Sequence, residues 1–144
     1  MLGIYIIIIM SENNKTVKVV YNSIHGGFGL NKNALAEYNK RTSRNIEFDE
    51  CIDRCDMILI DMVETMGVAI NESYSKLKIK EFPIKYKTFL SWNEYDGKET
   101  VTINYDKYLI YHIKCIKDNT TITLEEKMRH IQELYDEYDM NLNL

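Results

Sequence analysis

Five short segments of the chain carry the pattern of β-strands, being either continuously apolar or alternating between apolar and polar residues. We predict strands over residues 2–9, 17–21, 77–82, 88–95 and 98–103. Pro83 follows the third segment and is expected to end or bend it, because proline donates no backbone hydrogen bond to a neighbouring strand. Only Asp96 and Gly97 separate the last two segments, and this dipeptide is typical of a two-residue type I′ turn. A β-hairpin over residues 88–103 is therefore expected.

Four other segments repeat apolar residues every three or four positions, which is the period of an amphipathic helix. They span residues 31–41, 53–66, 106–117 and 123–138, and Asn31 is a suitable N-cap for the first of them. Gly67 lies where a glycine often ends a helix, whereas the start of the same helix is left open among Asp49, Asp53 and Asp56, all suitable N-caps. For residues 106–117 a strand stays an alternative. Thr123 and Glu126 form a capping box that opens the last helix.

These elements predict an α+β protein in which a small antiparallel or mixed sheet packs with helices. No repeat, linker or low-complexity segment divides the chain, so one domain over residues 1–144 is expected. The apolar run 2–10 is much shorter than the ~20 residues of a membrane-spanning helix and lacks the basic start of a signal peptide. Apart from a strand, these residues have one other interpretation, as extra residues upstream of a natural start at Met10.

The net charge limits the kinds of binding partner to be expected, and the cysteine content indicates the cellular compartment. The net charge of −4 argues against binding a nucleic-acid polymer or an anionic membrane, since both attract basic surfaces. Cys51, Cys55 and Cys115 are odd in number and form no disulfide framework, which favours a reducing, intracellular location. Cys51 and Cys55 have no neighbouring histidine or CxxC partner, so we expect buried thiols rather than a zinc site.

Three glycines lie between the strand at 17–21 and the helix at 31–41, at positions 26, 27 and 29. Free backbone N–H groups next to a helix N-terminus suit a phosphate or a carboxylate, and His25 adds a group that titrates near neutral pH. The spacing matches neither GxGxxG nor the P-loop, however. The alternative interpretation is a tight turn that places Phe28 in the core.

The predicted hairpin suggests a second candidate site. With a two-residue turn at Asp96-Gly97, Glu94 lies opposite Glu99 on the face that also carries Trp92. Two carboxylates at this distance repel each other unless something compensates. Arg54 is the candidate partner; a metal ion, ligand hydroxyls or a shared proton are the alternatives.

The order of motifs N-x-x-x-GGFGL, R-x-D-x-x-L-I-x-x-V-E-x-x-G, S-x-L-K-I-x-E-x-P and E-Y-D-G-x-E resembles a family of small, mostly uncharacterised proteins of bacteriophages and large DNA viruses. The resemblance covers residues 17–103 and leaves residues 104–144, a C-terminal helical hairpin, outside the shared core. It implies a virus-encoded protein located in the cytoplasm of the infected cell. The sequence differs at His25, Asn31 and Met57, where Tyr, Ser and Pro are usual. The matching residues are Asn22, Gly26 to Leu30, Arg54, Asp56, Leu59, Ile60, Val63, Glu64, Gly67, Ser75, Leu77 to Ile79, Glu81, Pro83, Glu94 to Gly97 and Glu99.

Three functions are compatible with these observations, and the sequence leaves open whether the protein is an enzyme. The first is a non-enzymatic protein that binds and sequesters a phosphate-bearing small ligand such as a nucleotide-type signal, in evasion of host defence. The second is a structural or interaction protein that forms a homo-oligomer. The third is a metal-assisted hydrolase that uses Glu94 and Glu99. No cofactor is expected apart from a divalent metal ion in that third case. The predicted ligand-binding residues are His25, Gly26, Gly27, Phe28, Gly29, Asn31, Arg54, Glu94, Asp96 and Glu99.

Overall fold

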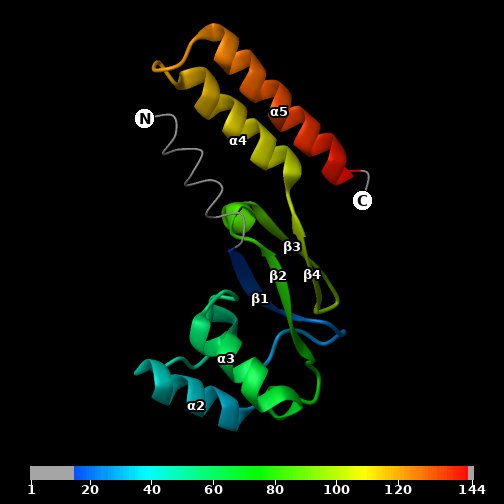
Figure 1. Ribbon diagram of the computed structural model, residues 1–144. Helices are drawn as coiled ribbons and strands as arrows, with labels where there is room; N and C mark the ends of the chain where they lie inside the picture. The colour runs from blue at the N-terminus through cyan, green and yellow to red at the C-terminus, as the bar shows by residue number, and fades with distance from the viewer. Residues whose placement is uncertain (1–14, 143–144) are drawn as a thin grey trace. The chain divides into compact units, whose positions relative to one another are not determined.

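A computed structural model of the chain describes residues 15–142 and divides it into two compact units, residues up to Thr102 and residues from Ile103 (Figure 1). The first unit contains the strands and two of the helices. Its elements are β1 (Thr16–Asn22), α2 (Lys32–Thr42), α3 (Met57–Met66), β2 (Leu77–Pro83), β3 (Leu90–Tyr95) and β4 (Lys98–Ile103), which reaches the boundary. The second unit consists of α4 (Tyr105–Asp118) and α5 (Leu124–Leu142). The predicted α+β class is confirmed, whereas a single domain over residues 1–144 stays a prediction.

The strands form two small antiparallel sheets rather than one. β1 pairs with β2 in a register that places Val20 opposite Ile79, and β3 pairs with β4. Val19 and Val20 are fully buried, because β-branched side chains fit a pleated surface that is covered. The strand predicted at residues 2–9 lies outside the described residues.

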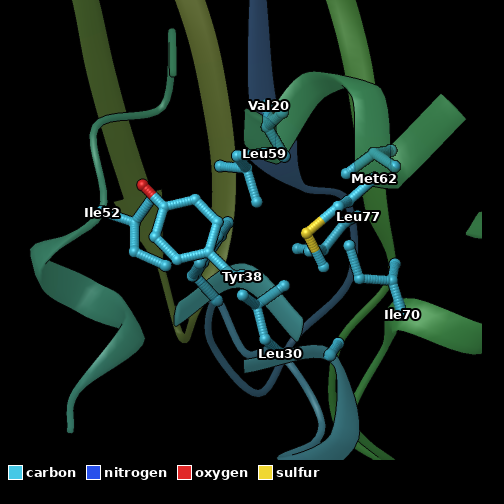
Figure 2. Close-up of a cluster of buried hydrophobic side chains, with 11 residues drawn as sticks. Val20, Leu30, Tyr38, Ile52, Leu59, Met62, Ile70 and Leu77 are labelled. Carbon is cyan, nitrogen blue, oxygen red and sulfur yellow. The ribbon is translucent and has the colours of Figure 1, made fainter. Parts of the chain in front are cut away.

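The core of the first unit lies where α3 packs against β1 and β2, with α2 packed against α3 (Figure 2). Tyr38 and Met62 are fully buried there, and Phe28 from the glycine loop belongs to the same cluster. The interpretation of Phe28 as a core residue is therefore confirmed. The buried members of the cluster are Val20, Phe28, Leu30, Ala34, Tyr38, Ile52, Leu59, Met62, Val63, Ile70 and Leu77.

Side-chain caps fix the ends of the two core helices. Asn31 accepts hydrogen bonds from the N–H groups of Asn33 and Ala34 and so begins α2. The start of the next helix was left open among Asp49, Asp53 and Asp56, and the structure selects Asp56: α3 begins at Met57, because the Asp56 carboxylate accepts from the first free N–H groups. Gly67 ends α3, as expected, with a φ of 56°.

The predicted hairpin is confirmed, with one correction at its start. Residues Ile84–Phe89 form a 3-10 helix after Pro83, so β3 begins at Leu90 rather than at residue 88. Asp96 and Gly97 have φ angles of 50° and 79°. Two consecutive positive values are the signature of the expected type I′ turn.

The second unit is an antiparallel helical hairpin. Residues 105–118 are helical, which excludes the alternative of a strand. Thr123 and Glu126 exchange the two hydrogen bonds of a capping box, as predicted. α5 continues to Leu142, beyond the expected end at residue 138. Within residues 15–142, no helix combines the length and the apolar composition needed to cross a membrane.

Candidate functional site

The glycine loop is closed against the turn of the β3–β4 hairpin. The N–H of Gly26 donates to the carbonyl of Asp96 at 2.9 Å. A Cβ at Gly97 would lie 2.0 Å from the backbone nitrogen of Gly27, so the two chain segments touch through their backbones. The Asn22 side chain, which is fully buried, donates to the carbonyls of Ile24 and Gly97 at 2.7 Å each. Two sequence-predicted clusters, the glycine loop and the hairpin turn, are thus adjacent.

Glu99 connects this junction to Arg54. One carboxylate oxygen accepts from the backbone N–H of Asn22 at 2.7 Å, and the other accepts from Nη2 of Arg54 at 2.9 Å. Only 8% of the Glu99 side chain and 17% of the Arg54 side chain are exposed. The expectation that Arg54 compensates a hairpin carboxylate is confirmed for Glu99. Because both oxygens of this carboxylate already accept hydrogen bonds from the protein, the pair is held firmly in place.

The guanidinium of Arg54 is also stacked on an aromatic ring. Its Cζ lies 3.2 Å from the ring centroid of Phe28, a geometry in which the ring face attracts the cation. Nη1 of the same guanidinium is buried and has no hydrogen-bond partner, the sole such side-chain nitrogen or oxygen within residues 15–142. Buried donors are rarely left unpaired, because an unmet hydrogen bond costs free energy.

An open depression of about 420 Å³ lies at this ion pair. Ile52 is buried in its lining, whereas Trp92 is 40% exposed and contributes a large aromatic surface. Two carboxylates and one guanidinium line it together with these apolar groups. The lining residues are Ile52, Asp53, Arg54, Trp92 and Glu99.

The N-terminus of α2, where we expected an anion, is already satisfied by side chains of the protein. Asn31 caps the first turn and also donates to the carbonyls of Ala69 and Asn71. The carboxylate of Asp49 accepts from the backbone N–H of Leu30 at 2.6 Å. Asp49 therefore places a negative charge next to the N-terminus of α2, which disfavours a phosphate there.

The remaining predicted site residues lie at the rim of the junction or away from it. His25 is 3.7 Å from the Asp96 carboxylate and meets the ring of Tyr95 edge-on, and all three side chains are largely exposed. Glu94 is exposed, and among the described residues it has neither an ion pair nor a hydrogen bond through its side chain, unlike Glu99. Gly29 is packed against the ring of Tyr74. The ten predicted residues therefore do not converge on one pocket; Arg54 and Glu99 line it, with Phe28 beneath the guanidinium.

Five residues of this region were absent from the predicted set: Ile52 and Asp53 of the lining, and Asn22, Trp92 and Asp49. Asn22 is the last residue of β1, and its burial, which makes its side-chain amide a hub of hydrogen bonds, had no signal in the sequence. Trp92 lies on the same predicted face of the hairpin as Glu99, so the alternation of side chains along the strand could have placed it at the site. Asp49 had no such signal, because its partner Leu30 is distant in sequence and pairs through its backbone.

The cysteines and acidic groups form no metal site in the part of the chain that is described, since no three His, Cys, Asp or Glu side chains there are arranged to hold an ion. All three cysteines are free. The expectation of buried thiols is wrong for Cys51, which is exposed, while Cys55 is half-buried. Burial, followed by the nearby Asp53 carboxylate, raises the pKa of the Cys55 thiol, which disfavours the reactive thiolate.

No family model, curated protein or solved structure matches the chain. The resemblance to the viral family stays a prediction. A function therefore has to be argued from the geometry of the Arg54 pocket and from the helical hairpin.

Proposed function

We propose that the protein is a non-enzymatic binder of a small ligand that combines a flat ring with one hydrogen-bond acceptor, which is the chemistry of a nucleoside or nucleoside monophosphate. The observation that carries the proposal is the guanidinium of Arg54, which lines the depression and whose buried Nη1 has no hydrogen-bond partner. Phe28 and Glu99 hold the guanidinium in place, so an acceptor would meet a preorganised donor. A carbonyl or an anionic oxygen of the ligand supplies the missing partner.

The ring of the ligand is assigned to Trp92. This side chain lines the depression and is 40% exposed, so it offers a face on which a heterocycle stacks. Such stacking contributes about 1 to 3 kcal/mol per base in proteins that bind single-stranded nucleic acid. The pairing of a stacking ring with a fixed donor favours a nucleobase over a purely aliphatic ligand.

The charges of the lining limit the number of phosphates. Asp53 and Glu99 are acidic and Arg54 is basic, so the depression carries more negative than positive groups. A di- or triphosphate would meet repulsion that a nucleoside or a monophosphate largely avoids. The helix N-terminus that would otherwise stabilise phosphate is satisfied by Asn31 and Asp49.

The non-enzymatic assignment rests on the state of the acidic groups. A general base needs an oxygen free to take a proton from a substrate or a water. Both oxygens of Glu99 accept hydrogen bonds from the protein, and Glu94 lies outside the lining of the depression. In the lining, Asp53 accepts from the backbone N–H of Cys55 through one oxygen, so its other oxygen is the one that the conversion assay below tests. If the viral resemblance holds, binding without turnover corresponds to sequestration of a nucleotide of the host.

The test uses Trp92, which is the single tryptophan of the chain and lines the depression. We expect nucleosides and nucleoside monophosphates to change its fluorescence, whereas ribose phosphate and inorganic phosphate leave it unchanged. The same ligands at a hundred times their Kd add roughly 2.7 kcal/mol of stability and raise the melting temperature. Analysis of the recovered ligand is expected to show no conversion.

The matched variants are Arg54→Lys and Arg41→Lys. Both keep the positive charge, but Arg54→Lys removes the planar fork in the depression, and we expect at least about a tenfold loss of affinity. Arg41 pairs with Glu37 and Asp61 outside the depression, so its variant should bind normally. Binding that is unchanged in a folded Arg54→Lys protein, or no response to any ligand in the wild type, contradicts the proposal. Conversion of a bound ligand contradicts its non-enzymatic part.

A further inference from the structure

Helix α5 carries an apolar stripe that is mostly uncovered. Its members recur at alternating intervals of four and three residues, the spacing of helices that pack side by side. No residue of α5 is buried, and four members of the stripe are 44% to 74% exposed. Surface helices gain most of their stability from burying such a face. The α5 stripe consists of Leu124, Met128, Ile131, Tyr135, Tyr138 and Leu142.

Helix α4 covers only one flank of α5. Hydrogen bonds join the two helices near the ends of the hairpin: Tyr138 donates to Asp106 at 2.5 Å, and Lys127 donates to the carbonyl of Lys117 at 2.7 Å. On α4, Tyr108 and Leu109 are buried. In α4 itself, Ile110 and Tyr111 are 68% and 54% exposed. The hairpin therefore presents apolar surface on both of its helices.

The two ends of the hairpin carry opposite charge. The open end, residues 105–110 and 134–142, has one basic and four acidic residues, whereas the loop end, residues 114–130, has four basic and three acidic residues as well as His130. The open end contains Lys107 with Asp106, Asp136, Glu137 and Asp139; the loop end contains Lys114, Lys117, Lys127 and Arg129 with Asp118, Glu125 and Glu126.

We propose that the α4–α5 hairpins of two copies of the chain associate about a twofold axis perpendicular to the helices and form an antiparallel four-helix bundle. In this arrangement the acidic open end of each hairpin lies against the basic loop end of the other, so the charges are complementary. A parallel pairing would place the two acidic ends together. The heptad spacing of the α5 stripe supplies the packing surface, and a twofold interface closes the assembly as a dimer.

Sedimentation analysis of the full chain tests the proposal through two variants of the same kind. Met128 belongs to the α5 stripe and is 65% exposed; Met140 lies on another face of α5 and is 66% exposed. We expect Met128→Gln combined with Tyr135→Gln to weaken the dimer by at least about tenfold. Met140→Gln should dimerise as the wild type does, and circular dichroism checks that the variants fold.

Salt tests the orientation. Raising sodium chloride from about 0.05 to about 0.5 M should weaken the dimer, because the complementary ends are exposed and screened. Dissociation that is unchanged or reduced by salt overturns the antiparallel arrangement. A wild-type chain that is monomeric at about 100 µM overturns the proposal. A dimer that persists in the Met128→Gln, Tyr135→Gln variant overturns it as well, because the α5 stripe would then not form the interface.

Discussion

Gly97 and Gly67 both adopt a positive φ, 79° and 56°, but they differ in the space around them. A Cβ at Gly97 would lie 2.0 Å from the nitrogen of Gly27, whereas none of the described atoms lies within 4 Å of a Cβ at Gly67. We expect Gly67→Ala to cost about 1 to 3 kcal/mol of unfolding free energy, from the backbone conformation alone, since its φ of 56° and ψ of −127° lie outside the regions that an alanine adopts readily. Gly97→Ala should cost more than about 3 kcal/mol, because backbone has to move.

Urea unfolding of the two variants measures this difference. Equal losses of stability would mean that the glycine loop and the hairpin turn separate readily, which contradicts the tight junction. The matched design matters because both substitutions add the same methyl group at a positive φ.

A contact of a single side chain was predictable only where the residue types of both partners pointed to it. The pairing of Arg54 with a hairpin carboxylate was predictable, because a buried charge at the end of an apolar face needs compensation. The choice of Glu99 over Glu94 was not, since it depends on the contact of Glu99 with the backbone of Asn22. The N-cap role of Asn31 was readable from residue type and position.

At the scale of elements, the ionisation of Tyr108 in α4 makes the stability of the helical hairpin depend on pH. Burial, together with the nearby Glu137 carboxylate, raises the pKa of Tyr108 to about 12 from the ordinary value of 10.0. The folded chain then binds its proton more tightly than the unfolded chain between these values. The contribution of Tyr108 to the free energy of unfolding is therefore fully present below about pH 10 and is lost as the pH rises through about 12.

The substitution Tyr108→Phe should remove part of this loss of stability between pH 10 and 12, measured by urea unfolding at each pH. Tyr111→Phe is the control in the same helix, since Tyr111 is 54% exposed. The absorbance of tyrosinate gives an independent readout of the ionisation. Identical pH profiles for Tyr108→Phe and the wild type would contradict the raised pKa.

Element boundaries were predictable where a local motif fixed them. Thr123 with Glu126, the Asp96-Gly97 turn and Gly67 all act on their own neighbours in sequence. The start of α3 was left open because Asp49, Asp53 and Asp56 are all suitable N-caps, and the structure selects Asp56. The start of β3 was wrong, because residues Ile84–Phe89 form a 3-10 helix and the strand begins after them.

Over the whole molecule, burial is uneven, and amide hydrogen exchange should follow it. β1 contains Val19 and Val20, both fully buried, whereas no residue of α5 is buried. We expect the slowest exchange in β1, β2 and α3 and fast exchange in α5 at low protein concentration. Protection of α5 should increase with concentration if the hairpins dimerise.

Exchange measured by mass spectrometry at two protein concentrations compares α5 with the core strands in each sample. The core strands act as the internal control, because they belong to the first unit. Protection of α5 equal to that of β1 in a dilute, monomeric sample would show that the chain itself covers the α5 stripe.

The sequence by itself determined the α+β class, the order of the described α-helices and strands, the N-cap of α2, the glycine that ends α3, the capping box of α5 and the hairpin turn. These follow from periodicity and from interactions between residues a few positions apart. Tertiary structure decided the division into two sheets, the contact of Gly97 with Gly27, the link from Asn22 through Glu99 to Arg54, and the carboxylate of Asp49 at Leu30. Each of these depends on backbone groups brought together from distant parts of the chain. Almost every residue has the same backbone N–H and C=O groups, so the sequence does not show which of them form such contacts.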